Sequence, residues 1–129
     1  MRTFVGGSIV TVDGVVDANV VVEDGKVIAL TDDPPAGEQV DVDGLLLFPG
    51  MVDTHVHLMD PGPTEREDFP TGTGAAAARG ATTIVEHTHG HPVRGVGDLS
   101  EKLGHLQGRS NVDYGLAAHV WPDRIGDLA

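Results

Sequence analysis

Apolar residues in the first third of the chain come in short runs that are separated by turn signals. The dipeptides Asp13-Gly14 and Asp24-Gly25 each stand between two such runs, a pattern typical of β-hairpins. We therefore predict a small antiparallel β-sandwich segment over residues 1–48. Strands are expected over residues 8–12, 26–30 and 45–48, and an extended run is expected over 15–22.

From residue 49 onward the pattern changes to strands that alternate with helices. Gly80 and Gly108 are expected to end two helices, and Asp98 with Glu101 predicts a helix start at residue 98. Such alternation is typical of a parallel α/β sheet, and continuous apolar strands suit burial on both faces. The predicted strands are 51–57, 82–86 and 114–120, and the predicted helices are 71–79, 98–107 and 122–129.

Histidines stand at the end of each predicted strand of this second region. His55 and His57 are two residues apart on one strand, so their side chains should share a face, together with Asp53. Two imidazoles on one face can converge on a divalent metal ion, which predicts that His55 and His57 are metal ligands. The alternative is a histidine pair in a turn or on a sheet surface. His87 and His119 follow the next two strands, at the sheet end where parallel folds carry their chemistry.

Composition narrows the classes of site and partner. The 129 residues contain no cysteine, so any metal ligand must be histidine, carboxylate or water. The net charge of −12 disfavours nucleic acid and anionic membranes as partners. No signal peptide and no apolar run of about 20 residues is seen, so a cytoplasmic location is expected. The acidic chain has only two lysines, which suggests a halophilic source, the alternative being an ordinary acidic protein.

One longer motif resembles a known family. Residues 43–57, with the sequence DGLLLFPGMVDTHVH, resemble the start of the amidohydrolase superfamily. Asp60-Pro61-Gly62, Glu67-Asp68-Phe69 and the GATTI stretch over 80–84 narrow the resemblance to the cyclic amidohydrolases. These are the dihydroorotases, allantoinases and hydantoinases.

The resemblance implies a fold and a metal centre. A small β-sandwich flanks a metal-dependent (βα)8 TIM barrel in this family, so residues 1–48 are expected in the sandwich. Residues 49–129 are expected to form about three βα units of a truncated barrel. The family holds two divalent metals, usually zinc, and His55 and His57 match the ligands of the more buried one. The bridging carboxylated lysine and the catalytic aspartate are expected beyond residue 129, so no catalytic residue is expected within this chain.

The resemblance also implies a substrate class. The complete enzyme is expected to be a homo-oligomer that hydrolyses an amide C–N bond in a small cyclic ureide or imide, such as allantoin, hydantoin or a dihydropyrimidine. Met59 stands where dihydroorotases carry arginine and allantoinases usually carry asparagine, which disfavours both strict assignments. The pocket candidates are Met59, His87, His89 and His119.

Several alternatives remain open at this stage. The histidine-rich loop over 87–91 fits a polar loop at the barrel mouth, a pocket lining or a third metal site. The alternative role for His119 is that of a structural histidine, hydrogen-bonded beneath a loop. The chain by itself is expected to be inactive, poorly stable and prone to aggregate. The other function classes are a non-catalytic scaffolding relative and a short metal-binding module that needs a partner chain.

Overall fold

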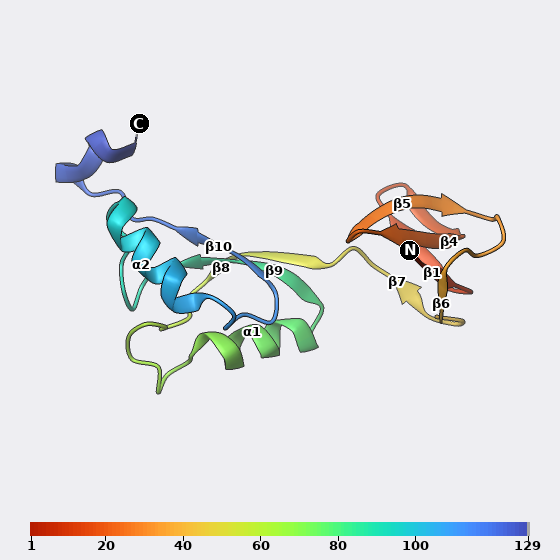
Figure 1. The fold of residues 1–129 in the computed structure, drawn as a ribbon, viewed down its shortest axis with the longest axis horizontal. Coiled ribbons are helices and arrows are strands. Elements are labelled where there is room, and N and C mark those ends of the chain that lie inside the picture. The colour runs from red at the N-terminus through yellow and green to blue at the C-terminus, as the bar shows by residue number, and fades with distance from the viewer. Residues whose placement is uncertain (129) are drawn as a thin grey trace. The chain divides into compact units, whose positions relative to one another are not determined.

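The computed structural model describes residues 1–128, which form two compact units that meet in sequence between Pro49 and Gly50. Figure 1 shows the strands and helices of the two units. Among the described residues, no helix has both the length and the apolar character that a membrane span requires.

The first unit consists of two small sheets. One sheet has the strand order β5-β4-β1-β6 and the other has the order β3-β2-β7. Apolar side chains of both sheets, among them Ile9, Val20 and Leu47, line a cavity of about 420 Å³. The strands are β1 Arg2–Val5, β2 Ser8–Thr11, β3 Gly14–Asp17, β4 Asn19–Glu23, β5 Lys26–Thr31, β6 Glu38–Asp41 and β7 Leu46–Leu47.

Both predicted hairpins are present. Strands β2 and β3 pair antiparallel around the first turn, and β4 and β5 pair antiparallel around the second. Asp24 and Gly25 have φ values of 48° and 74°, and two consecutive positive φ values are the requirement of a type I′ hairpin turn. The second dipeptide therefore forms its turn as predicted, whereas Thr11 pairs with Gly14 in the first hairpin, so the two residues between its strands are Val12 and Asp13.

The prediction that the first unit is purely antiparallel was wrong. Strand β1, which the pattern did not predict, pairs parallel with β6, and β2 pairs parallel with β7, so both sheets are mixed. The extended run over 15–22 also divides at Ala18, since β3 and β4 belong to different sheets. Alternation within a strand reports which side chains share a face, but it carries no information about which strands become neighbours.

The second unit contains a parallel sheet with the order β10-β9-β8. Strand and helix alternate along the chain as predicted, and Figure 1 shows α1 and α2 beside the three strands. Both helices contribute to one core, in which Phe69 of α1 and Leu106 of α2 pack with Ile84 of β9. The elements are β8 Met51–Val56, α1 Phe69–Ala78, β9 Ala81–His87, α2 Val96–Leu106, β10 Asp113–Ala117 and a 3₁₀ helix over Pro122–Leu128.

The helix ends show how local chemistry moves a predicted boundary. Helix α1 begins two residues before the predicted start because Asp68 caps it and Pro70, which needs no hydrogen-bond acceptor, fits its first turn. Asp98 was wrongly predicted as the N-cap of α2. The cap is Gly95, and the Asp98 carboxylate instead accepts a hydrogen bond from the Arg94 backbone N–H at 2.9 Å.

Strand β8 differs from its prediction in burial. Its residues from Met51 to His55 are exposed, although the apolar run suggested burial on both faces. The reason is its place at the edge of the sheet, where it pairs with β9 alone among the described strands. The third strand is also shorter than predicted, because β10 ends at Ala117 and leaves His119 beyond it.

Candidate metal centre

The two predicted ligands lie at the carboxyl end of strand β8, with His55 on the strand and His57 directly after its last residue. The ring centroids of His55 and His57 lie 5.0 Å apart with their planes at 90°. Both side chains are exposed. Asp53, the third residue expected on this face, accepts a hydrogen bond at its Oδ1 from the His55 backbone N–H at 3.1 Å.

Two further histidines join this pair from the end of β9. The ring of His87 stacks on His55 at a centroid distance of 3.9 Å and an interplanar angle of 15°. The ring of His89 lies 5.0 Å from that of His57. Segments about 30 residues apart in sequence thus bring together a group of four imidazoles, which we call the histidine group: His55, His57, His87 and His89.

Hydrogen bonds to backbone carbonyls define the tautomers of two of these rings. His57 Nδ1 lies 2.8 Å from the carbonyl oxygen of His87, and His87 Nε2 lies 3.1 Å from that of Thr54. Because a carbonyl oxygen only accepts, each of these ring nitrogens must carry the proton. Neutral His57 then presents the lone pair of Nε2, which is the donor that a divalent metal such as zinc requires.

This donor chemistry fits a metal ion but does not complete its coordination. Within the described chain, histidine, aspartate and glutamate side chains form no group of three or more with the geometry to hold a metal. A zinc site needs three or four protein ligands. His55 and His57 would accordingly be part of a ligand set, and their metal-binding role stays a prediction.

Two other predicted pocket residues have their contacts elsewhere. Met59 is only 3% exposed and packs closely against Gly90, while its backbone N–H donates to the carbonyl of Glu67. His119 is partly buried, its backbone N–H donates to Val93, and its ring lies 6.4 Å from Trp121. A pocket role for either residue remains a prediction.

A buried carboxylate lies three residues after His57 and was not singled out from the sequence. Asp60 accepts hydrogen bonds from His105 Nε2 at 2.6 Å, from Arg109 Nη2 at 2.7 Å and from the Phe69 backbone N–H at 3.1 Å. Burial raises the pKa of Asp60, but these three bonds outweigh it and lower the pKa to about 2. The carboxylate thereby ties the segment after β8 to the start of α1 and the end of α2.

A second buried charge lies on the far side of β9 from the histidine group. Glu86, the next-to-last residue of β9, points toward α2. Its Oε2 lies 2.9 Å from Nζ of Lys102 on α2, and both side chains are fully buried. This ionic contact lacks hydrogen-bond geometry, and Oε1 has no partner among the described residues. Burial raises the pKa of Glu86, and the Lys102 ammonium offsets this only in part.

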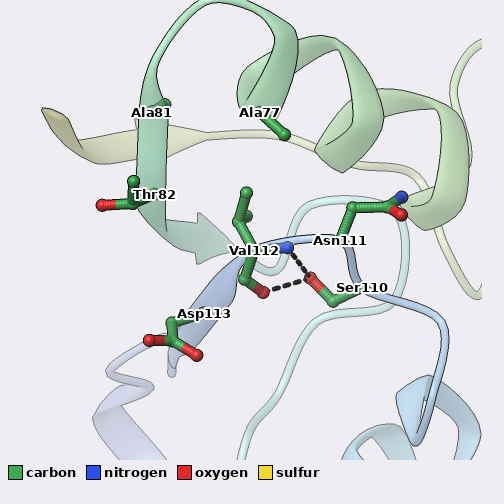
Figure 2. A pocket seen from close by; sticks show the side chains of 7 residues that line it. All are labelled: Ala77, Ala81, Thr82, Ser110, Asn111, Val112 and Asp113. Atoms are coloured by element: carbon green, nitrogen blue, oxygen red, sulfur yellow. Dashed lines mark hydrogen bonds between the residues drawn. The ribbon is translucent and has the colours of Figure 1, made fainter. Parts of the chain in front are cut away.

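The second unit also has a hollow of about 440 Å³ at the opposite end of its sheet (Figure 2). It surrounds the starts of β9 and β10, where Ser110 Oγ donates to the carbonyl of Val112 and accepts from the Val112 N–H. Because parallel sheets carry their chemistry at the carboxyl ends of the strands, the histidine group is the better candidate site. The hollow is lined by Ala77, Ala81, Thr82, Ser110, Asn111, Val112 and Asp113.

Comparisons with known proteins find related sequences and structures. The family model described as Dihydro-orotase-like matches residues 44–116. An allantoinase from Deinococcus radiodurans is 37% identical over 131 residues, covering 96% of this chain and 29% of the relative. A dihydroorotase from Shouchella clausii is 41% identical over 105 residues, covering 81% of this chain and 24% of the relative.

One solved structure is similar to this chain over nearly its whole length. The L-hydantoinase (dihydropyrimidinase) from Arthrobacter aurescens has a TM-score of 0.85 and 28% sequence identity, covering 98% of this chain. This chain spans 29% of that protein and of the Deinococcus relative. The similarity therefore concerns less than a third of either relative.

Proposed function

Because the chain belongs to the Dihydro-orotase-like family, we propose that it is the N-terminal portion of a metal-dependent cyclic amidohydrolase. The complete enzyme would hydrolyse an amide C–N bond in a small cyclic ureide or imide. The observation that carries this proposal is the adjacent pair His55 and His57 at the carboxyl end of β8. The names of the relatives, which are allantoinase, dihydroorotase and L-hydantoinase, support the substrate class.

The proposal assigns the two units to parts of a larger fold. Residues 49–129 would supply the first three strands of a (βα)8 barrel, and residues 1–48 would supply part of a β-sandwich. The parallel order β10-β9-β8 and the helices on one face of this sheet support the barrel assignment. The exposed edge strand β8 supports it too, because closing a barrel pairs every edge.

In this function His55 and His57 act as ligands and not as bases. The hydrogen bond of His57 Nδ1 to the His87 carbonyl leaves Nε2 for the metal, so this ring has no free nitrogen for proton transfer once it is coordinated. A bound divalent metal, zinc in this proposal, would polarise the amide carbonyl and lower the pKa of water. The remaining ligands and the proton-transferring aspartate would lie outside the 129 residues, so this chain alone would be inactive.

The residues around the ligand pair would line the substrate pocket. His87 and His89 are in ring contact with the pair, and Met59 and His119 are the other pocket candidates. A scaffolding relative without catalysis is the second candidate function. Intact His55 and His57 count against it, since a scaffold has no need of metal ligands.

Zinc binding tests the proposal directly. The 129-residue protein, His55→Ala, His57→Ala and the control His91→Ala would be dialysed against Zn²⁺, and the bound metal would be measured. Because two histidines are only part of a ligand set, we expect the wild type and His91→Ala to bind zinc weakly at equilibrium and the other two variants to bind less. Zinc retention by both ligand variants would contradict the assignment. Hydrolysis of dihydrouracil or hydantoin by the 129-residue protein would contradict its proposed inactivity.

A further inference from the structure

We propose that His87 is a positioning residue for the candidate metal centre. It restrains His55 and His57 in an arrangement that favours metal binding. This inference rests on the proposed function, because it assigns a role relative to those two ligands. It is based on three contacts, which His87 makes with Thr54, His55 and His57.

The first contact spans an irregularity in the sheet. Strands β8 and β9 pair at Asp53 with Ile84 and again at Val56 with Glu86, so β8 has one residue more than β9 between these pairs. An extra residue of this kind interrupts the regular ladder and redirects the side chains beside it. The His87 side chain donates from Nε2 to the Thr54 carbonyl at 3.1 Å, and it thus ties β8 to β9 within the irregular stretch.

The second contact fixes the ring of His57. The main-chain carbonyl of His87 accepts the Nδ1 proton of His57 at 2.8 Å. A hydrogen bond on the distal nitrogen of a ligating histidine sets its tautomer and orientation and raises its basicity. The position of this carbonyl depends on the conformation at the end of β9, which the His87–Thr54 bond restrains.

The third contact restrains the ring of His55. The imidazole of His87 lies against it at 3.9 Å, nearly parallel at 15°. His55 is exposed on an edge strand, where a side chain is otherwise free to change rotamer. Stacking limits that freedom and lowers the entropy that the ring loses when it coordinates a metal.

The two side-chain contacts can be removed separately from the carbonyl contact. His87→Ala removes both the stacked ring and the bond to Thr54. His87→Phe keeps a flat ring that can stack on His55 but removes the N–H donor. His91→Ala is the matched control, because it deletes an imidazole from the same loop.

The test measures Zn²⁺ affinity by competition with a chromophoric chelator, using the full 129-residue protein at neutral pH. Loss of a hydrogen-bonded partner behind metal ligands typically weakens binding about 10- to 100-fold. We expect a weakening in this range for His87→Ala, a smaller one for His87→Phe and none for His91→Ala. Long-range ¹H–¹⁵N NMR of the metal-free wild type should show His57 protonated at Nδ1.

The outcomes separate this inference from the proposed function. Undiminished zinc binding by both His55→Ala and His57→Ala would refute the proposed metal centre itself. Wild-type zinc affinity in both His87 variants, with binding still dependent on His55, would overturn only the positioning role. A His57 ring protonated at Nε2 in the metal-free protein would also overturn it, whatever the affinities.

Discussion

Replacing the buried Asp60 with asparagine should destabilise the second unit measurably. The side chain is 1% exposed and accepts three hydrogen bonds, two of them from His105 and Arg109. An asparagine side chain at this position would have nearly the same shape, but it would lack the charge and would direct an N–H₂ group at hydrogen-bond donors. The substitution therefore tests the electrostatic contribution and leaves the packing nearly unchanged.

The magnitude follows from the pKa of the carboxyl group. A fall of the Asp60 pKa from 3.8 to about 2 means that folding favours the ionised form. At about 1.36 kcal/mol for each pKa unit, this difference is worth about 2 kcal/mol of stability at neutral pH. His105 and Arg109 are 41% and 37% exposed, so solvent screening keeps the value from being larger.

The assay is urea unfolding followed by the fluorescence of Trp121, which is the single tryptophan and lies in the second unit. Asp113→Asn is the control, because it makes the same chemical change at an exposed position of that unit. Asp60→Asn should lower the free energy of unfolding by about 2 kcal/mol relative to this control. Equal unfolding midpoints for the two variants would refute the reasoning.

The pH dependence gives an independent check of the same reasoning. The folded-state pKa of Asp60 is depressed, so its contribution is complete above the unfolded pKa near 4 and is lost as the pH falls toward about 2. The wild type should therefore lose its advantage over Asp60→Asn across this range. A stability difference that stays constant from pH 6 down to pH 2 would contradict the electrostatic explanation.

Three further predictions concern other features. Lys102→Met should destabilise the second unit by about 3–5 kcal/mol, because it leaves Glu86 buried without its countercharge, and Glu86→Gln in the same chain should recover part of the loss in urea unfolding. Gly80→Ala should lower the free energy of unfolding by about 1–2 kcal/mol in the same assay, because Gly80 has a φ of 86°, which strains an alanine backbone, and open space around it leaves no steric clash to add. The control Gly104→Ala lies within α2 and should not destabilise the unit. Thermal unfolding should show a higher midpoint in molar KCl than in low salt, as the net charge of −12 predicts, and equal midpoints would count against a halophilic adaptation.

The strands and helices of the second unit could be predicted because each has a local cause. Strand β8 is an apolar run, α1 ends two residues before Gly80 with its positive φ, and the Asp24-Gly25 dipeptide forms the second hairpin turn of the first unit. Strand β1 and the parallel pairings could not be predicted, because a four-residue strand has too little pattern and its partners lie far away in sequence.

The candidate site was predictable in part for the same reason. His55 and His57 are neighbours on one strand, so their spacing alone brings their side chains together. The contact of His87 with both depends on the register between β8 and β9, including an irregularity that has no marker in the sequence. The buried contacts of Asp60 and Lys102 were not predicted, because each residue contacts side chains from another part of the second unit. The four-residue spacing of His105 and Arg109 was the one available signal for the Asp60 contacts.

The place of the histidine pair on an edge strand couples two equilibria. The open side of β8 can pair with a further strand, and such pairing would restrict the same backbone that carries His55 and His57. A metal ion bound to both rings would restrict that backbone as well. By thermodynamic reciprocity, each event must favour the other by the same free energy. Metal affinity would then report how completely the sheet beside β8 is assembled, and metal loading would in turn favour that assembly.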